Sequence, residues 1–157
     1  MHNGSGVDHH DHVQHQIALL ARRGERIRLE ALENVRSPLD RSGFLLLGHL
    51  EEQGPQTMSE LATAFDLDAS TVTRQVAPLE RRGWVVRTPS PHDRRATIVE
   101  VTEQGRRERE LVRQARISCL QRLMSDWGED EVAELAAMLE RLNATLGEGV
   151  AQYDEAR

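Results

Sequence analysis

The chain has 157 residues, of which 38% are hydrophobic and 29% charged, and its formal net charge is −6. These values are typical of one globular domain and exclude a disordered chain, while the single cysteine, Cys119, excludes an intramolecular disulfide and a multi-cysteine zinc site. No apolar run approaches the length of a membrane span and residues 1–16 lack a signal-peptide core, so we expect a cytoplasmic protein with no membrane partner.

The chain begins with a polar, His-rich stretch, residues 1–15, which has no periodicity and predicts a flexible tail. One domain is expected over residues 16–150. Its first helix, about 16–36, is indicated by apolar residues at three- and four-residue spacing. A second helix runs from about Pro38, which suits a first turn, to Gly54.

Two short helices follow in the sequence. Ser59 is expected to cap the first, and Asp68 or Ser70 the second, which spans Ala69–Arg82 and ends at Gly83. The apolar stripe that the second helix buries consists of Val72, Val76 and Leu79.

A β-hairpin is predicted next. Residues 84–87 and 97–101 are rich in β-branched and aromatic side chains, which favour strands, and the turn-rich, basic loop 88–96 joins them. Two short helices and a hairpin are the outline of a winged helix-turn-helix lobe, placed at about 38–101.

Two long helices complete the chain, one capped by Thr102 and ending near Met124, the other beginning at Glu129. With the first helix, they carry wider apolar stripes than one small lobe can cover, which predicts an α-helical dimerisation core formed by about 16–36 and 102–150. The expected fold is therefore mainly α with a small β-hairpin wing. The predicted dimer contacts are Ile17, Leu20, Ile27, Leu135, Leu139, Leu142 and Leu146.

Charge is unevenly distributed along the chain. Residues 69–95 hold six arginines against two acids, a balance of +4, whereas residues 126–157 hold nine acids against two arginines, a balance of −7. The basic block includes a polar helix face opposite the apolar stripe, formed by Ser70, Thr71, Thr73, Arg74 and Gln75. Arg and Gln can each form two hydrogen bonds to one base edge, and a helix of about 14 residues fits a major groove. This face predicts a recognition helix for double-stranded DNA.

The sequence resembles the multiple-antibiotic-resistance regulator (MarR) family from about Gln16 to Leu146. The resemblance rests on five segments in the same order and spacing: Ser59–Ala62, Asp68–Arg74, Leu79–Val85, Asp93–Ala96 and Val101–Gly105. It implies a homodimeric transcriptional regulator, with repression the expected mode, that binds a pseudo-palindromic operator. It also implies that Arg95 enters the minor groove, that Asp93 orients its guanidinium group, and that Arg94 contacts phosphate.

The resemblance further implies that a small ligand releases the DNA, and a small aromatic effector in the crevice between core and lobe is the candidate. Two residues depart from the family pattern. Pro78 lies inside the recognition helix, where we expect a tolerated kink. Some relatives that sense peroxide carry a reactive cysteine in the first helix, whereas Cys119 lies in the fifth, so we expect a buried structural thiol.

No catalytic motif is present, so the sequence predicts no enzyme and no cofactor. Two alternatives to a ligand-released DNA-binding regulator stay open: a winged-helix module that binds another protein, and a metal-responsive regulator that uses the N-terminal histidines. The first would not need the basic wing tip Asp93-Arg94-Arg95. Against the second, His9, His10 and His12 are too close together for a preformed tetrahedral site, so we predict no metal.

Overall fold

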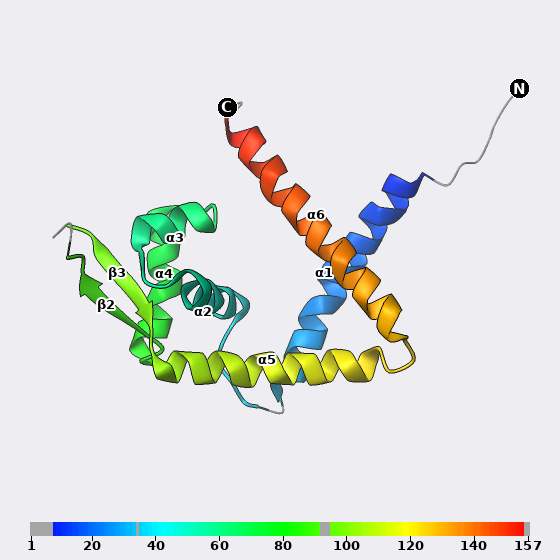
Figure 1. The fold of residues 1–157 in the computed structure, drawn as a ribbon, viewed down its shortest axis with the longest axis horizontal. Coiled ribbons are helices and arrows are strands. Elements are labelled where there is room, and N and C mark those ends of the chain that lie inside the picture. The colour runs from blue at the N-terminus through cyan, green and yellow to red at the C-terminus, as the bar shows by residue number, and fades with distance from the viewer. Residues whose placement is uncertain (1–7, 34, 92–94, 156–157) are drawn as a thin grey trace, which may run out of the picture. The chain divides into compact units, whose positions relative to one another are not determined.

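The computed structural model describes residues 8–33, 35–91 and 95–155 (Figure 1). The helices are α1 (His9–Glu33), α2 (Arg41–Gln53), α3 (Met58–Ala64), α4 (Ala69–Arg81), α5 (Glu103–Leu123) and α6 (Glu129–Glu155). The strands are β1 (Gln56–Thr57), β2 (Val85–Pro89) and β3 (Thr97–Val101). The predicted mainly helical fold with a small antiparallel wing is confirmed. None of these helices is both long and apolar enough to cross a bilayer.

The chain divides into two units, residues 1–119 and 120–157, and the division falls inside α5. The first unit contains an apolar core, to which α2, α3, α4, β2, β3 and α5 contribute. The predicted stripe of α4 is confirmed as part of this core. The most deeply buried members are Leu39, Leu46, Leu47, Leu50, Leu61, Val72, Val76, Val85, Val99 and Val112.

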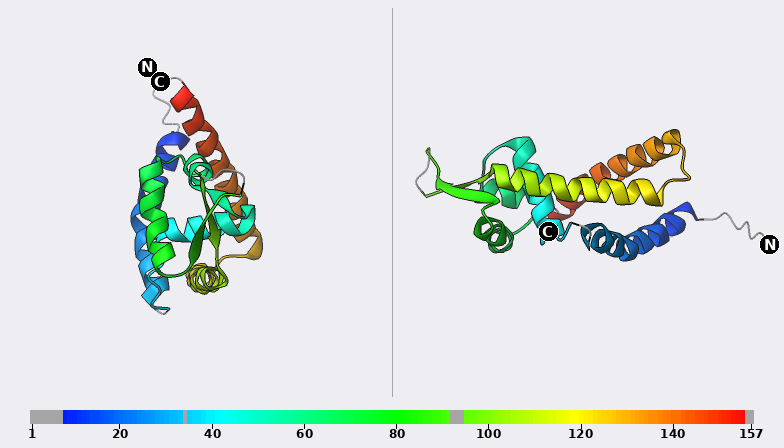
Figure 2. Two further views of the ribbon diagram at one scale, coloured as in Figure 1. Left: turned by 90° about the vertical axis from the view of Figure 1, so that its left-hand side faces the viewer. Right: turned by 90° about the horizontal axis from the view of Figure 1, so that it is seen from below.

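The sheet has three strands in the order β1-β3-β2, all antiparallel. Val85 pairs with Val101 at the base of the hairpin and Pro89 with Thr97 near its tip, and the hairpin projects away from the helices (Figure 2). The strand β1 was not predicted, because two polar residues carry no strand pattern. The strand β1 leads directly into α3, so the residues that precede α3 belong to the same sheet as the two strands of the wing.

Three helix starts differ from the prediction, and in each case a side-chain cap explains the difference. Residues 9–15 belong to α1 rather than to a tail, with Asp8 accepting a hydrogen bond from the His10 N–H (3.0 Å); residues 1–7 lie outside the described ranges. The helix α2 begins after Asp40, which accepts from the Gly43 N–H (2.8 Å), rather than at Pro38.

The third difference is the cap of α3, which is Thr57 rather than Ser59. Thr57 accepts from the Glu60 N–H (3.2 Å), and the Glu60 carboxylate accepts from the Thr57 N–H (2.7 Å). This reciprocal pair is a capping box, which satisfies two terminal N–H groups that a lone Ser59 hydroxyl would leave open.

The helix α5 packs on the lobe through Gly105 and Val112. Its buried residues, Gly105, Val112 and Cys119, recur every seven positions and so lie on one face. Thr102 caps the helix as predicted, accepting from the Gly105 N–H (3.0 Å), and Cys119 is buried as predicted. A Cβ at Gly105 would stand 2.1 Å from the Trp84 carbonyl oxygen, so only glycine allows this approach.

We predict that Gly105→Ala destabilises the protein by about 1–3 kcal/mol, because the methyl group meets a backbone atom that cannot move aside cheaply. Arg106→Ala is the matched control, since it shortens an exposed neighbouring side chain of the same helix and both residues favour a helix interior. Urea unfolding of both variants checks this. Equal stability of the two would contradict the close packing of α5 on Trp84.

Candidate nucleic-acid interface

The N-terminus of α4 is organised by one carboxylate, Asp68. Its Oδ1 accepts from the Thr71 N–H (2.8 Å) and the Ser70 hydroxyl (2.5 Å), and its Oδ2 accepts from the Thr71 hydroxyl (2.7 Å). Asp68 is thus the N-cap, one of the two predicted alternatives. The carboxylate also lies at the positive end of the helix dipole, where a negative charge is favourable.

These hydrogen bonds lower the pKa of Asp68 well below its ordinary value, with the Ser70 hydroxyl as the largest cause and the Thr71 donors next. The carboxylate therefore stays ionised at physiological pH. Because its charge holds Ser70 and Thr71, two of the predicted DNA contacts, the local geometry does not depend on bound DNA.

The cap continues into the predicted readout residues. Arg74 donates from Nη2 to the Thr71 hydroxyl oxygen (3.0 Å), and Thr73 donates to the Ala69 carbonyl oxygen (2.8 Å). The hydroxyl hydrogens of Ser70, Thr71 and Thr73 are therefore engaged within α4, which leaves oxygen lone pairs as acceptors. Ser70, Thr73 and Arg74 are exposed. The face thus combines exposed hydroxyl acceptors with one guanidinium donor, groups that can pair with base edges.

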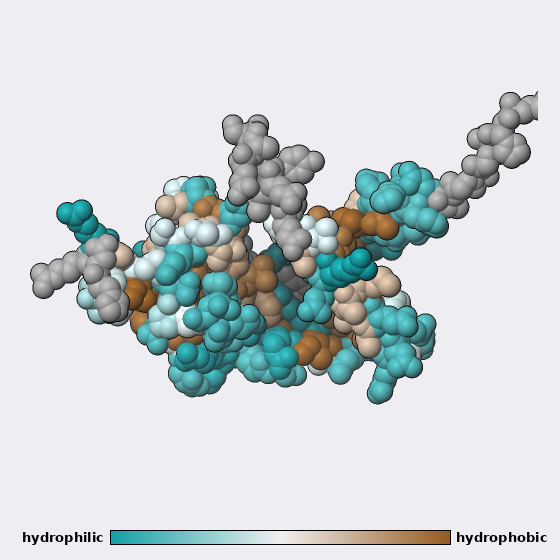
Figure 3. Space-filling model, turned by 45° about the horizontal axis from the view of Figure 1, so that its top comes forward, coloured by the Kyte–Doolittle hydropathy of each residue, from teal (hydrophilic) through white to brown (hydrophobic). Residues whose placement is uncertain are grey.

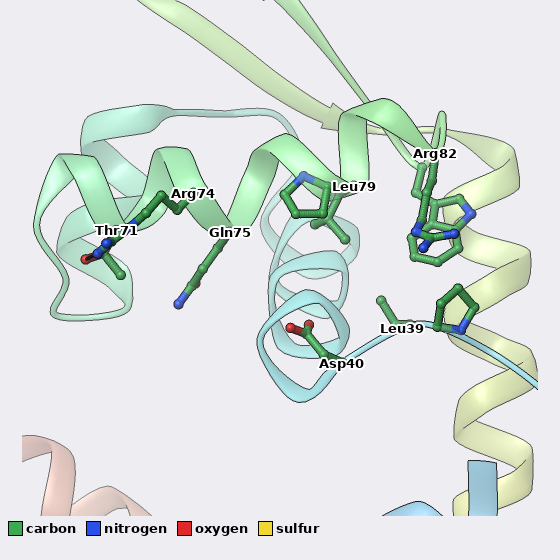
Figure 4. Close-up of a pocket in the computed structure, with 10 residues that line it drawn as sticks. Leu39, Asp40, Thr71, Arg74, Gln75, Leu79 and Arg82 are labelled. Atoms are coloured by element: carbon green, nitrogen blue, oxygen red, sulfur yellow. Dashed lines mark hydrogen bonds between the residues drawn. The ribbon is translucent and has the colours of Figure 1, made fainter. Parts of the chain in front are cut away.

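A hollow of about 370 Å³ lies beside this face (Figure 4). Thr71, Arg74 and Gln75 line one side from α4, and Leu39 and Asp40 line it from the segment that precedes α2. Gln75, which is half-buried, lines this hollow together with Arg74. The helix continues through Pro78 to Arg81, consistent with a tolerated proline.

The wing carries the other predicted contacts. Arg95 is exposed just before β3, whereas Asp93 and Arg94 lie outside the described residues. On β2, Arg87 Nε lies 2.9 Å from the Glu80 carboxylate of α4, an ion pair that joins the wing to the recognition helix. The wing and α4 are thus held together by the Arg87–Glu80 pair as well as by core packing.

Sequence reasoning had named Asp68 as a cap but missed its role in positioning Thr71 and, through it, Arg74. The signal was available, because an aspartate followed two and three positions later by Ser and Thr can accept from both hydroxyls. It also missed the Arg87–Glu80 pair, since nothing local links a strand residue to the preceding helix.

We predict that Asp68→Ala lowers stability at neutral pH and that this deficit becomes smaller in acid. The pKa of Asp68 is depressed in the folded protein, so its stabilisation is present above the ordinary carboxyl pKa and is lost as pH falls through the depressed value. Urea unfolding of parent and variant from pH 7 to pH 2 measures the gap, which should be constant down to about pH 5 and then shrink.

Asp68→Asn is the matched control. It keeps an acceptor for the Thr71 N–H, so it should be more stable than Asp68→Ala. The difference between these two variants should not change with pH, because neither ionises at this position. A gap between parent and Asp68→Ala that persists unchanged to pH 2 would contradict the ionised cap.

Comparison with known proteins places this geometry in a family. Residues 39–97 match the MarR family. The chain is 30% identical over 131 residues to the uncharacterised HTH-type transcriptional regulator YxaD of Bacillus subtilis (strain 168), covering 83% of this chain and 90% of the relative. It is also 30% identical over 144 residues to the transcriptional repressor MprA of Escherichia coli (strain K12), covering 87% of this chain and 82% of MprA.

A solved structure has the same fold. A mutant MarR from E. coli complexed with operator DNA matches with a TM-score of 0.68 at 24% identity, over 88% of this chain and 99% of that chain. The order of helices, the wing and the sequence identity to full-length relatives agree, and the chain belongs to the MarR family.

Proposed function

We propose that the protein is a sequence-specific DNA-binding transcriptional regulator that acts as a homodimer. The observation that carries the proposal is the outward face of α4, where the ionised Asp68 cap holds Thr71 and Arg74 in place before any DNA is bound. Groups arranged in advance lose less freedom on binding, so the arrangement favours recognition. We assign base reading to Ser70, Thr71, Thr73, Arg74 and Gln75.

The relatives support this proposal by their names. One is a transcriptional regulator and another a transcriptional repressor, while the MarR of similar fold was solved with operator DNA. Repression is therefore the mode we propose, without enzymatic activity. We assign the wing a second role, in which Arg95 enters the minor groove, Asp93 orients it and Arg94 contacts phosphate.

Dimerisation is supported by apolar side chains that the single chain leaves open. Ile17 and Leu20 of α1 are 43% and 57% exposed, and Leu135, Leu139 and Leu146 of α6 are 37%, 38% and 54% exposed. Figure 3 shows that hydrophobic residues lie at the surface among hydrophilic ones. We assign these residues, with the half-buried Ile27 and Leu142, to contacts with a second copy. Burial of a leucine is worth roughly 1.5–3 kcal/mol, so several per chain can offset the cost of association.

Two identical lobes related by two-fold symmetry would address half-sites about one helical turn apart, roughly 34–36 Å. A small aromatic effector would release the DNA only by binding more tightly to a dimer whose lobes are wrongly spaced. Repression and its relief then follow from one equilibrium between two lobe spacings.

The test of the function uses fluorescence anisotropy with duplexes from the protein's own upstream promoter and with random duplexes, over a range of salt. We expect tighter binding to one promoter duplex than to random DNA, with affinity falling linearly in log salt. Arg74→Ala should lose about 1–3 kcal/mol on that duplex and much less on random DNA, because a base contact carries the specificity.

Arg81→Ala is the matched control, since it removes an exposed arginine from the same helix at the end away from the cap. Its losses should be similar on both DNAs. If the parent bound all duplexes equally, the proposal of sequence-specific regulation would be wrong. If the parent were specific but Arg74→Ala lost the same affinity on the promoter duplex and on random DNA, Arg74 would be a phosphate contact.

We further predict that Leu139→Glu splits the dimer and collapses operator affinity although no DNA-facing residue changes, because each lobe then binds without the second half-site. Ala137→Glu, on the opposite face of α6, should leave the dimer intact. Sedimentation velocity and circular dichroism check assembly and folding. A folded Leu139→Glu dimer that still bound the operator would mean that this face of α6 does not form the interface.

A further inference from the structure

Arg109 of α5 is a half-buried charge whose position the DNA-reading residues do not explain. Its Nη1 donates to the Glu51 carboxylate of α2 (2.6 Å), and the two side chains are only 19% and 22% exposed. The guanidinium carbon also lies 5.1 Å from the centre of the Phe44 ring. Arg109 therefore joins α5 to α2 by an ion pair and a cation–π contact at once.

The guanidinium group lies against the backbone of α2 at Gly48. A Cβ at Gly48 would stand 2.6 Å from Nη2, 2.8 Å from Nε and 2.9 Å from Cζ of Arg109. Any larger residue would push the guanidinium group out. Glycine is unfavourable in a helix interior compared with alanine, so Gly48 weakens α2 locally while making room for Arg109.

Stability alone does not require an arginine here. Within the described residues, the buried Nε of Arg109 has no hydrogen-bond partner, and burying a charge is costly when it is incompletely paired. An apolar side chain of similar length would avoid that cost. The arginine instead favours one orientation of α5 on α2, because its planar guanidinium group contacts Gly48, Glu51 and Phe44 at once.

A second contact supports the same alignment of α2 on α5. Arg116, two helical turns after Arg109, places its guanidinium carbon 4.0 Å from the centre of the same Phe44 ring. One ring of α2 is thus contacted by two arginines of α5. Rotating α2 about the α5 axis would break both contacts, whereas the apolar contacts of Val112 lack such a directional preference.

We propose that Arg109 is a positioning residue for DNA binding, which fixes the angle at which the lobe is carried on α5 and so the spacing of the two lobes. The inference rests on the proposed DNA-binding dimer. The helix α5 is continuous from Glu103 to Leu123, and the division between the two units of the chain falls inside it. A dimer gains from its second half-site only if both lobes are held at the matching distance.

The first test measures half-site spacing on DNA. The half-sites are defined by the parent's own footprint, and duplexes carry them at the native spacing or with one or two base pairs added or removed. Arg109→Met and Gly48→Ala should each bind the native spacing about tenfold more weakly than the parent and show a flattened spacing preference. Affinity for a duplex with a single half-site should not change.

Gly48→Ala also separates the guanidinium group from α2, but it leaves the charge in place, because its methyl group displaces only the flexible end of Arg109. The double variant should therefore lose no more than either single variant. Arg113→Met is the matched control: it removes the same charge one turn further along α5, from a residue paired with Glu110 (2.6 Å) rather than with the lobe. Arg113→Met should keep the spacing preference of the parent, whereas Arg109→Lys should keep that preference only in part.

The second test reads lobe spacing without DNA. A spin label at Thr88→Cys, exposed on β2, reports the distance between the two wings of a dimer by pulsed electron resonance, while the buried Cys119 stays unlabelled. The parent and Arg113→Met should give a narrow distance distribution, and Arg109→Met and Gly48→Ala a broad one.

A narrow distribution in both Arg109→Met and Gly48→Ala, or an unchanged spacing preference, would overturn the proposal. So would an equal loss on all duplexes accompanied by a lower unfolding temperature, since that is a purely structural effect. If the parent bound no duplex specifically, the proposed function would fail, and the distance measurement would still decide whether Arg109 sets the spacing; a monomeric parent would overturn it.

Discussion

Burial of Val72, Val76 and Leu79 determines which side of α4 faces solvent. Each of these side chains is almost fully buried, and burying each is worth roughly 1.5–3 kcal/mol. Turning the helix to hide its polar face would expose all three. The outward direction of Ser70, Thr73 and Arg74 is therefore a consequence of the core, and the Asp68 cap only refines it.

The lobe that contains the recognition helix also contacts α5. Two of these contacts depend on a glycine, and one of the two brings a charged side chain against the glycine. Gly105 lets α5 reach the Trp84 backbone, and Gly48 lets Arg109 reach α2. Neither approach tolerates a Cβ, so the lobe and the first part of α5 are aligned by geometry rather than by apolar area alone. The DNA-binding dimer proposed above needs alignment of this kind, because both of its lobes must reach the DNA together.

Much of the lobe was predictable because its signals are local. The stripe Val72, Val76 and Leu79 has helical spacing, and Gly83 adopts the positive φ of 72° that ends α4. The Thr57–Glu60 capping box was equally local but was overlooked in favour of Ser59. The early start of α1 was missed because histidines and aspartates carry no apolar period.

Contacts between distant residues could not be predicted in this way. Arg109 and Gly48 are ordinary helix residues in the sequence, and only the packing of α5 on α2 reveals their relationship. The pairing of β1 with β3 is similar, since Gln56 and Thr57 acquire strand structure only from their partner. For the candidate site, the polar face of α4 was predicted from its residue types, whereas the hydrogen bonds that hold it required the fold.

In the proposed function, two lobes of this kind read DNA together, each through the outward face of α4. Hydroxyl-radical footprinting of the protein on its own upstream promoter tests it most directly. We expect two protected windows on one face of the duplex, with centres separated by about 10–10.5 base pairs or a multiple of that distance. Uniform protection along the fragment, or a single window at all protein concentrations, would contradict the claim.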